Sequence, residues 1–412
     1  MGVQMNMKNK MSGNIKVISK TVPIQVVPAK NDLDPVARGR KIILQLRHII
    51  HFESSIGINR LYLLYHRRLV LWLNHLFSVF FMSIAVYCVL RNRSELTATY
   101  MVIVNTTCVE YLCLVIISML AKKSSFRNFF EDLAHFDSLL NLNGDLKITS
   151  PSGRGLAWIV ASVLYSICEF FSLSTYMIQK IDYSFMLTYI TLVAHDCEQI
   201  LFCSVLRMIL IRVRILKAHV LKTLVPKNSR EAKKKLLEVE ALSYRAQLDI
   251  GTLHRNYELL HKCAEQLNSI MSLPMMLMLF CSGLSTTMLL RQLFRVLQST
   301  TFESGMGSGL IAYVLSRCLR YTLLVVMPCL ISSTTTTQVA CIRTTLHDAM
   351  NQFDIDKADR RRVKAFFQLT KENEFAYALW GLIRLNMSLP LSYLSLCTTY
   401  LVIIIQFSKF ID

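Results

Sequence analysis

Several side chains that could do chemistry lie inside long apolar stretches of this 412-residue sequence. They are carboxylates, cations and an amide: Glu110, Glu169, His195, Asp196, Glu198, Gln199, Arg317 and Arg320. Such groups are costly in an apolar setting unless they are paired or face a cavity. They could therefore bind a polar small molecule, transfer protons, or form buried ion pairs that fix the packing of neighbouring elements.

The adjacent residues His195 and Asp196 are the pair that is most typical of catalysis. No nucleophile and no second His at a useful spacing accompanies them. The 12 cysteines contain no Cys-x-x-Cys pair and no Cys/His cluster at zinc spacing. We therefore expect no enzyme activity, no cofactor and no metal site.

Apolar runs of bilayer length form the elements that must position these groups. The sequence is 53% hydrophobic and 18% charged, and runs of about 20 apolar residues are long enough to cross a bilayer. We predict an all-α integral membrane protein with seven transmembrane helices. Their expected positions are 69–90, 97–120, 155–178, 183–211, 267–290, 309–333 and 391–408.

Lys and Arg are distributed unevenly between the segments that join these runs. Thirty-six of them lie in 1–68, 121–154, 212–266 and 334–372, whereas the alternate segments hold six. The positive-inside rule places the N-terminus in the cytoplasm, and with seven spans the C-terminus is extracellular. Because topology accounts for the formal charge of +19, we expect no nucleic-acid partner.

The chain divides into four expected regions. These are a cytoplasmic N-terminal region at 1–68, a six-helix transmembrane bundle at 69–333 with cytoplasmic helical extensions at 212–266, cytoplasmic anchor helices at 334–390, and a last membrane helix with a short extracellular tail at 391–412. The first ~40 residues lack periodicity and are predicted to be disordered. Pro390 breaks the last helix into a cytoplasmic part and a membrane part.

A nine-residue pattern closes the sequence: Thr399-Tyr400-Leu401-Val402-Ile403-Ile404-Ile405-Gln406-Phe407. On a helix, Thr399, Val402 or Ile403, and Gln406 share one face, and the Gln406 amide has no partner in lipid. Thr-Tyr, five hydrophobic residues and Gln-Phe resemble the signature of insect gustatory (taste) receptors, which are related to insect odorant receptors. Length, topology and the broken last helix extend the resemblance to most of the chain.

The resemblance implies a ligand-gated, non-selective cation channel in the plasma membrane of gustatory neurons. Such receptors assemble as tetramers, so a homotetramer or a heterotetramer with related receptors is expected in the lipid bilayer. In each subunit, helices one to six surround an outward-facing pocket for a small-molecule tastant. The last helix lines a central pore, and the inner ends of helices four to seven anchor the subunits to one another.

The pore and gate are therefore predicted at Thr399, Val402, Ile403, Gln406 and Phe407. Four copies of Gln406 would form a ring of amides that contacts a hydrated ion, and Val402 and Ile403 would form a constriction that gates by dewetting. Phe407 either closes this gate or packs beside it. Alternatively, Gln406 hydrogen-bonds a neighbouring helix and has no role in permeation.

The ligand pocket is predicted where polar groups at membrane depth meet aromatic side chains. Its predicted residues are Tyr165, Glu169, Phe170, Tyr189, His195, Asp196, Tyr313 and Arg317. Arg317 and Arg320 are one helical turn apart, and Glu169 and Asp196 are their expected partners. Aromatic walls favour a bitter plant compound, while the paired polar groups leave a sugar open. Ion pairs that only fix helix packing are the alternative.

Two other classes of membrane protein fit less well. A receptor that signals through G proteins would have the opposite topology, and the sequence has no Asp-Arg-Tyr-type triplet after the third span. A transporter built from inverted repeats would show internal symmetry, which is absent from this sequence.

Overall fold

The structure, a computed structural model, is almost entirely helical. It describes residues 35–65, 67–91, 98–140, 152–177, 187–224, 248–298, 306–351 and 356–411. The predicted disorder of the first ~40 residues falls almost wholly outside these ranges, as does the middle of the predicted extension at 212–266.

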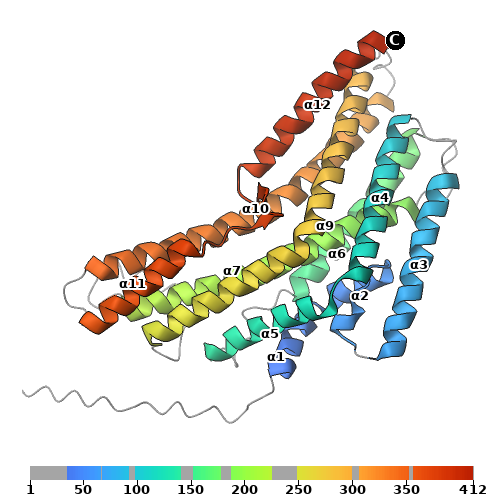
Figure 1. Ribbon diagram of the computed structural model, residues 1–412. Coiled ribbons are helices and arrows are strands. Elements are labelled where there is room, and N and C mark those ends of the chain that lie inside the picture. Colours follow the sequence, from blue (N-terminus) through green and yellow to red (C-terminus); the bar gives the residue numbers. More distant parts are fainter. Residues whose placement is uncertain are drawn as a thin grey trace, which may run out of the picture. The chain divides into compact units, whose positions relative to one another are not determined.

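Seven long helices correspond to the seven predicted spans (Figure 1). They are α3 (Arg68–Arg91), α4 (Ala98–Leu120), α6 (Ser152–Met177), α7 (Tyr189–Leu224), α9 (Ile250–Gln298), α10 (Met306–Asn351) and α12 (Leu389–Ile411). Within the described residues, α3, α4, α9, α10 and α12 are long and apolar enough to cross a membrane, and α6 contains a shorter apolar stretch, Gly155–Phe171. The count of seven spans stays a prediction for α6 and α7, and so does the orientation.

Helix α3 shows why these sequences require lipid. Its 24 residues give a length of about 36 Å at 1.5 Å per residue, enough for a hydrocarbon core of about 30 Å. Large apolar side chains such as Leu69, Trp72 and Phe80 are exposed on it. Apolar residues occur around the whole circumference, as is typical of a helix that faces lipid.

Helix α7 lies at the centre of the bundle and packs against α4, α6, α9 and α10. Most of its 36 residues are buried, including His195, Asp196, Glu198 and Gln199. Because protein surrounds it, its polar side chains can find partners on neighbouring helices, which lipid does not offer. This setting explains why a helix with so many polar groups occupies the core.

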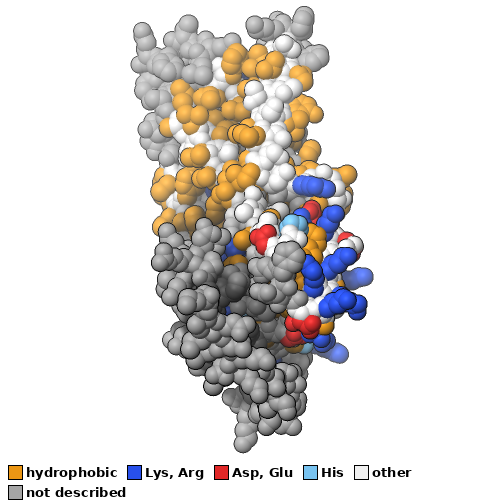
Figure 2. Space-filling model, turned by 90° about the vertical axis from the view of Figure 1, so that its left-hand side faces the viewer, with side chains coloured by type: hydrophobic (Ala, Val, Ile, Leu, Met, Phe, Trp, Pro, Cys, Tyr) orange, Lys and Arg blue, Asp and Glu red, His pale blue; other side chains and the backbone are white. Residues whose placement is uncertain are grey.

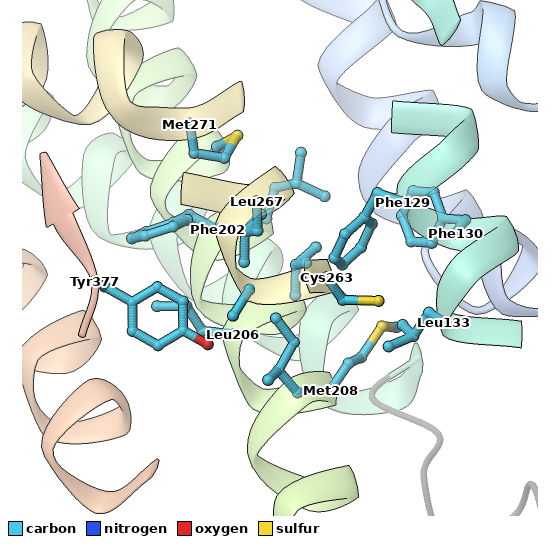
Figure 3. Packing of buried hydrophobic residues seen from close by; sticks show 14 of the residues in the cluster. Phe129, Phe130, Leu133, Phe202, Leu206, Met208, Cys263, Leu267, Met271 and Tyr377 are labelled. Carbon is cyan, nitrogen blue, oxygen red and sulfur yellow. The ribbon is translucent and has the colours of Figure 1, made fainter. Parts of the chain in front are cut away.

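Shorter helices pack around the lower ends of these long helices in Figure 1. They are α1 (Pro35–Gln45), α2 (Arg47–Ser55), the 3₁₀ turn η1 (Leu61–Leu63), α5 (Lys123–Leu139) and α11 (Lys357–Glu372). In Figure 3, Phe129 and Leu133 of α5 point toward α9 and α7, and all three elements contribute to the largest hydrophobic core. The largest hydrophobic core is therefore continuous from the apolar bundle into this part. Among these shorter helices, only α11 lies in a region that was predicted as helical, the anchor helices at 334–390.

The break in the last region is a β-hairpin where the sequence predicted helix. Strands β1 (Ala378–Leu379) and β2 (Ile383–Arg384) pair antiparallel between α11 and α12. Trp380 and Gly381 in the turn have φ angles of 49° and 71°, which a right-handed helix does not allow. Pro390 lies in the first turn of α12, where its missing N–H costs no hydrogen bond.

Apolar and basic side chains occupy separate zones on one face of the molecule. Figure 2 shows hydrophobic side chains over the upper part and a group of Lys and Arg side chains below them. The exposed apolar residues of α12 include Leu391, Leu396 and Val402, and the exposed basic residues of α11 include Arg361 and Lys364. This segregation is expected where a membrane meets water.

Candidate functional site

The predicted pore face of α12 is uncovered in the single chain. Thr399, Val402, Ile403 and Gln406 are all exposed. The opposite face holds the helix in place: the Tyr393 hydroxyl lies 2.9 Å from the Thr286 hydroxyl of α9. The side chain of Phe407 lies outside the described residues. Helix α12 therefore presents the face with Thr399, Val402, Ile403 and Gln406 outward, while its other face is packed.

Arg320 connects three helices through the polar cluster. Its Nη1 lies 2.7 Å from Glu169 of α6, and its Nη2 contacts Asp196 of α7 and donates to Ser166 at 3.0 Å. The guanidinium also lies over the ring of Tyr165, 5.1 Å from its centroid. Of the two arginines that were predicted to pair with Glu169 and Asp196, Arg320 pairs with both carboxylates.

Arg317, one turn earlier on α10, has a different environment. Its Nη1 donates to the Tyr313 hydroxyl at 2.5 Å, and it makes no carboxylate contact within the described residues. Its guanidinium lies 5.9 Å from the Tyr189 ring centroid and 5.8 Å from that of Tyr313. Phe170 packs edge-on against Tyr189 at 5.7 Å. Four predicted pocket residues are therefore neighbours.

His195 belongs to a second group of contacts on α7. Its Nδ1 is paired with Glu110 of α4, and its ring packs edge-on against Tyr321 at 5.9 Å. It also borders a cavity of about 30 Å³, between α7, α9, α10, the hairpin and the start of α12. A cavity of this volume is large enough for water and too small for a tastant.

Most residues that line this cavity were not predicted to be functional. Besides His195 they are Gln199, Phe202, Met275, Met278, Leu279, Ser282, Leu324, Val325, Pro328, Leu379, Leu385 and Leu389. Gln199 donates its side-chain amide to the carbonyl oxygen of Leu324 at 2.6 Å. The sequence signal was Pro328 inside a predicted helix, because a proline removes one backbone hydrogen bond and often bends the helix there.

A buried triad of Arg60, Glu53 and Glu198 lies where the N-terminal segment meets α7. Arg60 donates to Glu198 at 2.5 and 2.7 Å and to Glu53 of α2 at 2.9 Å. Burial raises the pKa of Glu53 to about 8, although Arg60 opposes the rise. The two carboxylates raise the pKa of Arg60 against the effect of burial, so it stays charged. This triad could not be predicted from the sequence, because 138 positions separate Arg60 from Glu198.

The described residues give no support for a metal site. Within them, no group of three or more His, Cys, Asp or Glu side chains could hold a metal ion. The polar groups instead pair with one another inside the bundle, as ionisable groups at membrane depth usually do. The arrangement can bind a small molecule or fix the packing of the helices. Together, the apolar helices and the polar interior define a multi-pass helical membrane protein.

Comparisons with known proteins identify the family. The sequence matches the family model described as 7tm chemosensory receptor over residues 49–411. The chain belongs to this family of chemosensory receptors. A search of curated proteins gave no match.

Solved structures agree with this fold. The structure of the insect olfactory receptor OR5 from Machilis hrabei in complex with eugenol is similar with a TM-score of 0.61 and 13% identity. A second structure of that receptor is similar with a TM-score of 0.60 and 12% sequence identity. In both cases the similarity covers 90% of this chain and 100% of the other. At these identities the similarity shows a shared fold, and ligand and assembly do not transfer with it.

Proposed function

We propose that this chain is a gustatory chemoreceptor that acts as a ligand-gated, non-selective cation channel. The observation that carries the proposal is the outward face of α12. Thr399, Val402, Ile403 and Gln406 are uncovered in the single chain, although an amide has no favourable contact in lipid. Association of four copies around an axis gives these side chains a common pore, with Gln406 as a ring of amides.

The ligand site of this channel is the aromatic and polar cluster of α6, α7 and α10. Tyr165, Phe170, Tyr189 and Tyr313 surround the paired groups described above, and each is buried or half-buried. Such a mixture of aromatic walls and few polar groups is typical of small-molecule sites. A bitter plant compound is the proposed ligand class, and a sugar is the alternative within the same family. The relative whose structure contains eugenol supports a small molecule as ligand.

The membrane placement follows from the charge distribution. We propose that the N-terminus and α11 are cytoplasmic, that the C-terminus is extracellular, and that the chain resides in the plasma membrane of gustatory neurons. Residues 334–390 then anchor the subunits of a homotetramer or of a heterotetramer with related receptors. The separation of the apolar zone from the basic zone supports this placement (Figure 2).

Whole-cell recording tests the proposal. The chain is expressed alone with G-protein signalling blocked and exposed to sugars and to plant alkaloids, glycosides and sterols. We expect a non-selective cation current whose permeability ratios change in Gln406→Ala. The matched control is Gln368→Ala, the same change at an exposed site on α11. A response that disappears with the block would instead support a receptor acting through G proteins, and unchanged permeation in Gln406→Ala would remove the proposed pore role.

A further inference from the structure

Among the described residues, the guanidinium of Arg317 has no carboxylate partner of the kind that a buried cation usually has. The residue is 6% exposed, and in the described part of the chain its Nη1 donates a hydrogen bond to the Tyr313 hydroxyl. The nearby acids are already engaged: Glu169 and Asp196 pair with Arg320, and Glu110 pairs with His195. A buried cation without a carboxylate is costly, so this position favours an additional acceptor.

Three buried polar atoms near this guanidinium have no hydrogen-bond partner within the described residues. They are Nε of Arg317, the hydroxyl oxygen of Tyr100 and Oε1 of Glu169. Both Tyr100 and Glu169 interact electrostatically with Arg317, so they lie close to it. Buried polar groups are nearly always hydrogen-bonded. Two of these three atoms can donate, and a bound oxygen acceptor would satisfy them.

The surrounding side chains determine what shape of molecule fits. Tyr189 and Tyr313 present their rings to the guanidinium, and Phe170 stands edge-on to Tyr189. Planar rings pack favourably against aromatic side chains in offset or edge-on arrangements. A flat conjugated group is therefore a better match to these walls than a compact saturated one.

The charge of Arg317 decides between ligand classes. A protonated amine placed here would meet a like charge in a setting of low dielectric, where repulsion is strong. A carboxylate would form a charge-assisted pair with the planar guanidinium, and a neutral carbonyl would still accept one hydrogen bond. The alternative is that Glu169 turns its free oxygen to Arg317, which would cancel the charge without any ligand.

We propose that Tyr100, Phe170, Tyr189, Tyr313 and Arg317, together the Arg317 site, select a planar conjugated ligand that carries a carboxylate or carbonyl oxygen and reject protonated amines. This inference rests on the proposed function, because it names the ligand class of the same receptor site. The Arg317 site would then bind acidic and neutral oxygenated plant compounds and exclude basic alkaloids.

Three probes with one carbon skeleton test the charge rule: cinnamate, methyl cinnamate and cinnamylamine. Their binding to the purified full-length protein is measured by equilibrium dialysis at neutral pH. We expect cinnamate to bind most tightly and cinnamylamine most weakly, with a difference of about tenfold or more. Arg317→Gln should abolish the difference. Arg40→Gln, which removes the same charge from the exposed surface of α1, should preserve it.

Equal affinities, tighter binding of the amine, or no binding of any probe at millimolar concentration would overturn the inference. If Arg317→Gln fails to fold, the order of the affinities of the three probes for the wild-type protein tests the inference. Tyr100→Phe then provides a milder variant, which should weaken cinnamate about threefold and leave the amine unchanged. Currents are recorded separately. Selective binding of cinnamate without any current would contradict only the proposed channel activity. A cation current activated by cinnamylamine would contradict only the proposed ligand class.

Discussion

Gln199 of α7 donates to the Leu324 carbonyl of α10, the carbonyl that Pro328 leaves without its helical partner. The N–O distance is 2.6 Å, and Pro328 lies four residues after Leu324, where its own N–H would have donated. The same residues border the cavity beside the hairpin and the start of α12. A side chain on the central helix therefore completes the backbone of a proline-containing helix next to the proposed pore helix.

Replacing Gln199 tests this relationship. We expect Gln199→Leu to destabilise the protein by about 1–3 kcal/mol, because the Leu324 carbonyl loses its partner in a buried place. In Pro328→Ala the helix regains its own donor, so adding Gln199→Leu to that variant should cost much less. Melting temperatures of the four proteins in detergent measure the coupling. Additive losses would show that the two residues act independently.

Arg320 should be the most sensitive residue of the polar cluster. Arg320→Met leaves Glu169 and Asp196 as buried, unpaired carboxylates, and we expect a loss of about 3–5 kcal/mol. Adding Glu169→Gln and Asp196→Asn should recover much of this loss, because it removes the stranded charges. Yield of folded protein and its melting temperature report both effects. A variant without any loss would mean that the pairs contribute nothing to packing.

Stability should depend on pH through Glu53. Its pKa is raised from 4.5 to about 8 by burial, so between these values the folded protein keeps a proton that the unfolded chain loses. The favourable contribution is complete below about pH 4.5 and is lost as pH rises toward 8. We expect the melting temperature to fall across this window and Glu53→Gln to reduce the fall. An identical profile in both proteins would contradict the assignment to Glu53.

The basic residues of α11 should act on assembly. Arg360 donates to the Met350 carbonyl at 2.9 and 2.7 Å and so caps the last turn of α10. Neutralising Arg360, Arg361 and Arg362 to Gln should therefore reduce the tetramer fraction in size-exclusion chromatography and leave the reversal potential of the current unchanged. A shift in ion selectivity with normal assembly would place these charges on the ion path instead.

The orientation has a direct test. With seven spans and a cytoplasmic N-terminus, an epitope added after the last residue should be stained on intact cells, and an N-terminal epitope only after permeabilisation. The N-terminal tag serves as the control for membrane integrity. The opposite staining pattern would favour the topology of a G-protein-coupled receptor.

The local sequence was sufficient to predict those features whose physical cause lies in neighbouring residues. The predicted first span, 69–90, differs by one residue at each end from α3 because a continuous apolar run meets charged residues there. The pairing of Arg320 with Glu169 and Asp196 was also predictable, since few other groups at membrane depth could neutralise it. Gly381 was a visible turn signal within the segment that was expected to be helical.

Sequence alone thus determined the apolar helices, the charge asymmetry that predicts orientation, and the pattern at the C-terminus that resembles the family signature. The tertiary structure decided which groups meet: Arg60 with Glu198, Gln199 with Leu324, and Arg317 with the ring of Tyr189. The physical reason is that an apolar run forms a helix in lipid whatever its neighbours are. The partner of a buried polar group depends on where two helices cross, and residues distant in sequence jointly fix that crossing.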